Sequence, residues 1–415
     1  MPRSSAWSRD IFAWTLFDFA NTGFYVVMIS VVFPTFFNDV IAGGDEAYWG
    51  RAISASMLIT ALIGPLLGSM ADATNRKKLY LGLFTTACIV ATAAAYGTGP
   101  GTLALAFCLL IVANVGFEGG TIFYDAFLPE ITTPENYSRV SGYGFAMGYL
   151  GSLVILAMIL PILSAEGRTV DDVRLTFIIA AGFFAIFSLP LFLRLKEHRR
   201  AMPDGGSLLV VGYQRLRQTF THIRNYQGVK RFLLAFFVYN DSILTVIAFA
   251  SIYGKESLKM ELSELILFFM VVQITALIGS LVFGRITATI GARQSIIITL
   301  VIWLGITIAA FLVDSKTGFF VIGGVAGIAL GSSQSCSRTL MALLTPADKK
   351  TEFFGFYDGF FGKASATLGP LIYGEAASAY GQRPAMLVVG VLFLLGIGLM
   401  FRVPDARPQL AESAS

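Results

Sequence analysis

Residues 64–78 read GPLLGSMADATNRKK, and this stretch sets the interpretation of the whole chain. Its apolar half carries glycines four residues apart, a spacing that places both on one face of a helix. Asp72 follows, and then three consecutive basic residues, Arg76, Lys77 and Lys78. An apolar helix that ends in a short basic loop is typical of a membrane span that reaches the inner surface of a membrane.

The composition extends this interpretation to all 415 residues. Hydrophobic residues make up 55% of the chain and charged residues 13%, whereas about a quarter of a soluble domain is charged. This excludes a cytosolic enzyme, a disordered chain and a nucleic-acid binder, and it makes the lipid bilayer the expected partner. The three cysteines show no paired spacing, and the sequence holds no phosphate loop and no nucleophile elbow. We therefore expect no metal, no cofactor and no enzymatic activity.

Apolar stretches of about 20 residues, long enough to cross a bilayer, recur along the chain. They predict an all-α membrane protein with twelve transmembrane helices, at residues 11–38, 50–71, 79–98, 102–126, 139–163, 173–194, 231–253, 262–286, 294–313, 317–341, 352–374 and 383–402. A polar, basic stretch divides them into two pseudo-symmetric six-helix halves, residues 1–193 and 231–415. This linker, residues 194–230, contains an amphipathic pattern typical of a helix on the membrane surface.

The distribution of positive charge predicts the orientation. With a cytoplasmic N-terminus, Lys and Arg on the inner side outnumber those on the outer side by 21 to 7. Both termini and the linker are therefore expected in the cytoplasm, in a multi-pass protein of the cell (inner) membrane.

The two halves also repeat their pattern of glycines, basic loops and mid-span polar residues. Repeated halves of this kind indicate a secondary transporter whose site lies between the halves, at the middle of the membrane. At the position that corresponds to Asp72, the second half has Ala288.

Four stretches together resemble one known family. Residues 64–78 are similar to the loop motif of the major facilitator superfamily. Residues 14–24 (WTLFDFANTGF), the pair 123–131 (FYDAFLPEI) and 139–151 (RVSGYGFAMGYLG), and residues 331–346 with 352–371 resemble its Atg22-like permease branch. Fungal members of that branch are associated with amino-acid efflux from the vacuole.

The resemblance implies the major facilitator fold and transport by rocking of the two halves. It also implies that Gly68, Asp72, Arg76 and Lys77 act as a gate at the cytoplasmic mouth. Asp72 is expected to hold the two halves together at its own loop only. The corresponding residue of the second half, Ala288, carries no charge.

Polar and charged side chains inside spans are costly, which makes each one a candidate for the transport cavity or for proton transfer. In the first half the candidates are Asp18, Asn21, Tyr25, Asn114 and Glu118. In the second half they are Asn240, Asp241, Thr245, Gln273, Gln334, Arg338 and Lys363.

Some of these residues have an alternative role. Glu118 lies mid-span and is the best candidate for a carboxylate that takes up a proton, because burial disfavours the charged form of a carboxyl. Asp125 lies nearer the cytoplasmic end, where a gating pair with Arg139 or another basic residue is as expected as contact with the substrate. Arg338 could bind a substrate carboxylate or pair permanently with Asp241 or Glu118.

Acids predominate in the spans of the first half, and cations occur only in those of the second. A site between the halves would present both signs, which suits a zwitterion such as an amino acid. We expect a monomeric secondary transporter of a small polar solute, coupled to H+. The alternatives are an uncoupled facilitator, an exporter of a peptide, sugar or drug, and a non-transporting receptor or scaffold.

Overall fold

A computed structural model describes most of the chain, in segments that together hold all the elements below. The described residues are 8–43, 46–74, 76–167, 169–197, 212–214, 217–218, 226–260, 262–346, 348–365, 373, 376 and 379–406. Among them, ten helices are long and apolar enough to cross a membrane. These ten coincide with ten of the twelve predicted spans.

The first group of helices begins with a helix that changes its winding. α1 (Arg9–Tyr25) starts at Ser8, whose side chain accepts a hydrogen bond from the Ile11 amide at 3.2 Å. It continues through the π-helical residues Val26–Val31, α2 (Val32–Phe36) and a second π-helical stretch, Phe37–Ile41. The helical segment therefore extends to Ile41, beyond the predicted end at residue 38, because the π-helical turns continue the helix.

The other helices of the first group follow the apolar pattern closely. They are α3 (Glu46–Thr74), α4 (Lys77–Ala94), α5 (Leu103–Asp125), the short α6 (Leu128–Ile131), α7 (Tyr137–Leu163) and α8 (Val170–Arg194). α8 begins with a capping box in which Thr169 and Asp172 satisfy each other's backbone amides.

The second group comprises α10 (Gln227–Leu258), α11 (Leu262–Ile290), α12 (Ala292–Leu312), α13 (Lys316–Leu344) and α17 (Gln382–Met400), together with a broken segment. That segment is α14 (Lys350–Phe354), the π-helical residues Gly355–Phe361, and α15 (Gly362–Ala364). α10 has 32 residues and is about 48 Å long, enough to span a bilayer. The rest of the predicted span 352–374 lies mostly outside the described residues, as does most of the amphipathic stretch in the linker.

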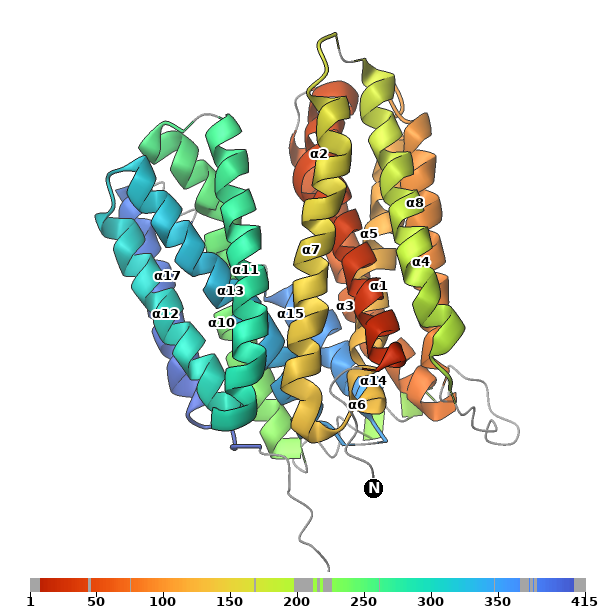
Figure 1. Cartoon of the computed structure of the whole chain (residues 1–415), viewed down its shortest axis with the longest axis vertical. Coiled ribbons are helices and arrows are strands. Elements are labelled where there is room, and N and C mark those ends of the chain that lie inside the picture. Colours follow the sequence, from red (N-terminus) through yellow and green to blue (C-terminus); the bar gives the residue numbers. More distant parts are fainter. Residues whose placement is uncertain are drawn as a thin grey trace, which may run out of the picture.

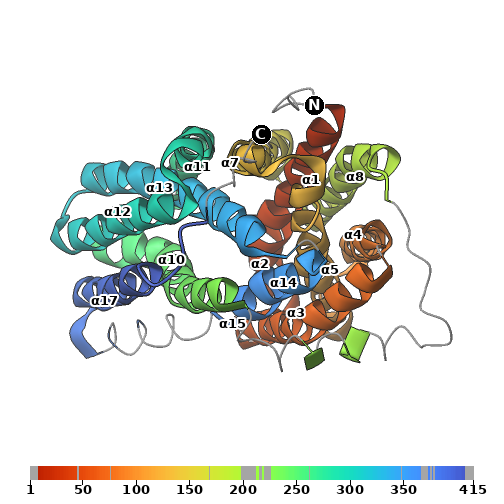
Figure 2. The ribbon, with the colours of Figure 1, turned by 90° about the horizontal axis from the view of Figure 1, so that it is seen from below.

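The two groups of helices lie side by side and meet at one end. Figure 1 shows α1 to α8 on one side, α10 to α13 and α17 on the other, and α6 and α14 near the lower end. Figure 2, seen from below, shows α14 and α15 beside α3. We refer to the meeting of α3 with residues 350–361 as the first seam, and to the meeting of α7 with α11 as the second seam.

Small residues let the helices approach closely at both seams. A Cβ atom placed on Gly68 would lie 2.4 Å from the carbonyl oxygen of Thr351, and one placed on Gly142 would lie 2.5 Å from that of Ser280. Gly64 faces Gly355 in the first seam, one helical turn from Gly68. Only glycine allows such backbone contacts, and they fix how the polar side chains of the two groups meet.

A candidate transport site between the helix groups

The first buried cation at this boundary is Arg338 of α13. Its Nε lies 2.9 Å from Oδ1 of Asp125 on α5, and its Nη2 lies 3.6 Å from Oδ2 of Asp18 on α1. The three side chains are almost completely buried, at 4%, 6% and 7% exposure. One cation of the second group therefore joins two carboxylates of the first.

Aromatic rings close around this arginine. Its guanidinium lies 3.8 Å from the ring centroid of Phe145, 5.4 Å from that of Trp14 and 5.5 Å from that of Tyr124. Trp14 and Tyr124 stack with centroids 4.5 Å apart, and the Trp14 indole donates to the Tyr124 carbonyl at 3.0 Å. Ring faces attract a planar cation, so the rings and the two acids together compensate a charge that would otherwise be costly to bury.

The second buried cation, Lys363, has a simpler environment. It follows the π-helical stretch on α15 and forms an ion pair with Glu118 of α5. Its side chain is 17% exposed, against 4% for Arg338. Tyr25, at the end of α1, interacts electrostatically with both members of the pair and stacks on Phe117 with centroids 5.3 Å apart. This pair again joins the two groups, but with one acid in place of two.

Asp358 lies near both buried cations, although it is not among the candidates selected from the sequence. It lies beside Asp125 and interacts electrostatically with both Arg338 and Lys363, so it connects the two ion-paired clusters. The signal was its position five residues before Lys363. In a regular α-helix that spacing separates two side chains, whereas the wider π turn at residues 355–361 brings them toward one face.

Further polar candidates lie at contacts between helices. Asn240 donates to the Ser365 hydroxyl at 2.7 Å, and Tyr149 of α7 donates to Gln334 of α13, between the two helix groups. Asn114 instead donates to Ser56 at 2.7 Å, a bond between α5 and α3 that lies inside the first group. It ties two neighbouring helices.

The structure also places the remaining candidates from the sequence. Asn21 and Asp241 are buried. Thr245 donates to the backbone carbonyl of Asp241 at 2.7 Å. The Oε1 atom of Gln273 is buried and accepts no hydrogen bond from the described residues.

The predicted gating residues lie at the first seam and beside it. The Asp72 carboxylate accepts a hydrogen bond from the Glu352 amide at 2.9 Å, in the first turn of α14. Gly68 makes the close contact described above. Lys77 forms an ion pair with Glu130, and Arg76 precedes it at the start of α4. A carboxylate from one group thus caps a helix of the other, where the positive end of the helix dipole attracts it.

A second basic residue adds to this seam. Lys350 donates to the Pro129 carbonyl at 3.2 Å, and burial together with the charge of Lys77 lowers the pKa of Lys350. Glu352 is fully buried at the same place, and sequence reasoning did not select it. Its position next to the first seam shows only in the folded chain.

One predicted pairing was wrong, and another is made with a different basic residue. Asp125 pairs with a basic residue, as expected, but this residue is Arg338 and not Arg139, whose side chain is exposed at the start of α7. Arg338 pairs with Asp18 and Asp125 in place of Asp241 or Glu118, because the partner of Glu118 is Lys363. The order of residues along the chain did not show which helix faces which.

The arrangement of the helices defines the class of fold, that of the major facilitator superfamily. Similar solved structures are the human organic anion transporter MFSD10 (TM-score 0.75, 13% identity, 94% of this chain and 99% of that chain) and the proton:xylose symporter XylE (TM-score 0.72, 13% identity, 96% of each chain). At this level of identity the similarity concerns the fold.

Sequence comparisons identify the family. The family model described as "Vacuole effluxer Atg22 like" matches residues 45–411. An uncharacterized MFS-type transporter of Bacillus subtilis, YxiO, is 30% identical over 406 residues, covering 95% of this chain and 94% of its own. Autophagy-related protein 22 of Yarrowia lipolytica is 26% identical over 334 residues, covering 72% of this chain and 56% of its own. The chain belongs to the Atg22-like family of major facilitator permeases. It is an integral membrane transporter and not an enzyme.

Proposed function

We propose that this permease is a secondary transporter that moves a small zwitterionic solute, such as an amino acid, by alternating access. The two moving units are the halves at residues 1–193 and 231–415, joined by the cytoplasmic linker at 194–230. The observation that carries the proposal is the ion pair between Glu118 of the first half and Lys363 of the second.

A zwitterion can replace this pair without leaving a charge unpaired. Its carboxylate would bind the Lys363 ammonium, and its ammonium would bind the Glu118 carboxylate. The exchange keeps both signs compensated at every stage, which is what a site in a low-dielectric environment requires. A neutral sugar or an apolar drug carries no charges that could replace the partners of Glu118 and Lys363, so neither could take the place of the ion pair.

The helix contacts support an outward-open state. Both seams are closed at the end of the molecule where α6 and α14 lie (Figure 1). If this end faces the cytoplasm of the cell (inner) membrane, as the distribution of positive charge predicts, the cytoplasmic mouth is shut. Asp72, on the first seam only, would then hold the shut state until the halves rock.

Proton coupling follows from the same pair. We assign the proton to Glu118, since it is the carboxylate of the proposed site and would change its partner as the solute binds and leaves. A proton would enter with the solute or in exchange for it. We propose H+ as the coupling ion and a monomer as the working unit.

A ligand screen by thermal shift tests the class of solute. Purified protein is heated with amino acids, short peptides, nucleosides or sugars, since a ligand that binds only the folded state raises its melting temperature. We expect amino acids to raise the melting temperature of the wild type and not that of the Lys363→Gln variant. A rise with sugars alone, or an equal rise in both proteins, would contradict the proposed site.

A flux assay separates the alternatives. In proteoliposomes with an imposed pH gradient, wild-type uptake should follow the gradient, and Glu118→Gln should transport without that dependence. Uptake that ignores the gradient in both proteins indicates an uncoupled facilitator. Binding without flux indicates a receptor.

A further inference from the structure

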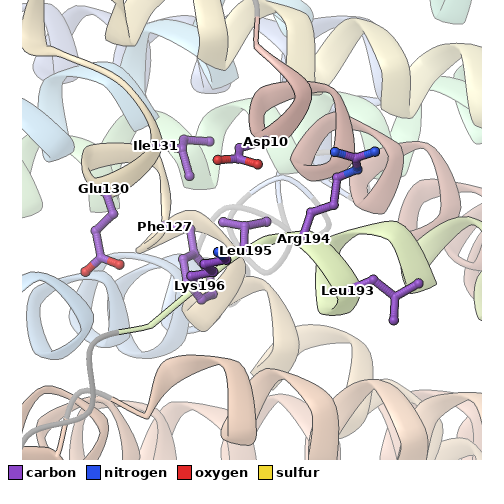
Figure 3. A pocket seen from close by; sticks show the side chains of 8 residues that line it. All are labelled: Asp10, Phe127, Glu130, Ile131, Leu193, Arg194, Leu195 and Lys196. Atoms are coloured by element: carbon purple, nitrogen blue, oxygen red, sulfur yellow. The ribbon is translucent and has the colours of Figure 1, made fainter.

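Two adjoining cavities lie at one end of the first helix group, away from both buried ion pairs. One has a volume of 530 Å³ and opens between α1, α6 and α8; Figure 3 shows it with Glu130 at the left and Arg194 at the right. The other has a volume of 500 Å³ and is lined by residues of α1 and α8, among them Arg9 and Phe12. Arg194 lines both, so they share a wall.

The charge at this shared wall is positive. Arg9 is the first residue of the helical segment 9–41 and Arg194 is the last residue of α8, and the predicted orientation puts both at the same surface of the bilayer. Both side chains are exposed, and neither forms an ion pair with any residue in the described part of the chain. Asp10, Glu130 and Lys196 line the neighbouring cavity (Figure 3), but Glu130 forms an ion pair with Lys77, so the basic side chains remain in excess.

An apolar wall continues from the arginines toward the bilayer interior. Phe12, which is 44% exposed, and Leu16 lie on α1, and Pro190 faces them from α8. Seven residues separate Arg9 from Leu16, which corresponds to a rise of about 10 Å along a helix. A ligand here would meet guanidinium groups at the membrane surface and hydrocarbon below it.

We propose that this groove binds a membrane phospholipid, with its phosphodiester between Arg9 and Arg194 and an acyl chain along Phe12, Leu16 and Pro190. Guanidinium groups bind phosphate oxygens in a bidentate manner. Basic pockets between spans are suited to lipid headgroups. The apolar wall favours a lipid over a free anion, because a free anion gains nothing from it.

Native mass spectrometry of the purified full-length chain tests the proposal, with phosphatidylglycerol as the probe and diacylglycerol as the lipid without phosphate. The wild type should retain phosphatidylglycerol, and the Arg9→Gln/Arg194→Gln variant should bind it at least about tenfold more weakly, as expected for the loss of two basic contacts at a membrane surface. The matched control is Lys230→Gln/Arg285→Gln, which removes two exposed charges from the second group and should bind like the wild type. An Arg9→Lys/Arg194→Lys variant, which keeps both charges, should retain most of the binding and so shows that the groove is intact.

Three results would overturn the proposal. Equal weakening in the control pair would mean that lipid responds to overall charge and not to this groove. Equal retention of diacylglycerol would mean that the phosphate is not recognised. Displacement of the lipid by an equal concentration of soluble glycerol phosphate would identify a site for a free anion.

Discussion

The two buried cations at the boundary between the helix groups differ in how completely they are enclosed. Arg338 contacts two carboxylates and three aromatic rings and is 4% exposed. Lys363 has one ion-pair partner, Glu118, interacts electrostatically with Asp358, and is 17% exposed. A cation enclosed on all sides has no room for a solute, whereas a cation with one partner can exchange it. Under the proposed function, Arg338 therefore holds the helices together and Lys363 binds the solute.

The largest effect on stability is expected from Arg338→Ala. The substitution leaves Asp18 and Asp125 buried without their cation, and breaking a buried pair in this way costs about 3–5 kcal/mol. The melting temperature in detergent should fall sharply. The control is Lys316→Ala, whose ion pair with Glu264 at 2.6 Å is partly exposed and is worth about 0–1 kcal/mol. Equal melting temperatures for the two variants would remove the distinction drawn here.

Lys363→Gln should show the opposite balance between stability and transport. Because only one acid loses its partner, the free energy of unfolding should fall by less than for Arg338→Ala, by about 1–3 kcal/mol. Uptake should nevertheless be lost, since the solute carboxylate has no cation to bind. In the double variant Glu118→Gln/Lys363→Gln, stability should recover while uptake stays absent. Recovery of uptake together with stability would make the pair purely structural.

Gly68→Val should disturb Lys363 more than Arg338. The new side chain would collide with the Thr351 backbone, at a cost of about 1–3 kcal/mol for overpacking, and would push away the segment that leads to Lys363. Hydrogen exchange at residues 350–361 should accelerate, and exchange around Arg338 on α13 should not. The control is Gly120→Ala, where the nearest atom lies 3.8 Å from an added Cβ. Unchanged exchange at residues 350–361 in Gly68→Val would contradict the first seam as described.

The smallest effects concern the charge at the seams. Asp72→Asn keeps an oxygen to accept from the Glu352 amide but loses the interaction of a full charge with the α14 dipole, worth about 0.3–1 kcal/mol. Exchange of that amide should accelerate only a few-fold. Ala288→Asp, an exposed position on α11, should change stability by less than about 0.5 kcal/mol. A larger change in the free energy of unfolding for Ala288→Asp would mean that an acid also affects stability at the second seam, which contradicts the difference drawn between the two seams.

The membrane spans could be predicted from the sequence because the cost of burying polar groups in lipid leaves a clear pattern. Ten of them coincide with helices in the described part of the chain. The end of the first span could not be placed, because the π turns at residues 26–31 and 37–41 depend on packing and leave no periodicity to read.

The candidate site shows the same limit. Asp18, Glu118, Arg338 and Lys363 stood out because each is ionisable within an apolar stretch. Their pairing could not be predicted, since it depends on which face of α5 meets α13 and which meets α15. Asp358 could not be linked to Lys363 from the sequence, because a five-residue spacing turns two side chains toward one face only where the helix has wider π turns.

Uptake of labelled amino acids into proteoliposomes tests the central claim most directly. Wild-type protein and the Lys363→Gln variant are reconstituted in equal amounts and compared with protein-free vesicles. The wild type should accumulate at least one zwitterionic amino acid above the protein-free level, and Lys363→Gln should not. Wild-type uptake of no amino acid in the panel, or equal uptake by both proteins, would contradict transport of a zwitterion through the Glu118–Lys363 pair.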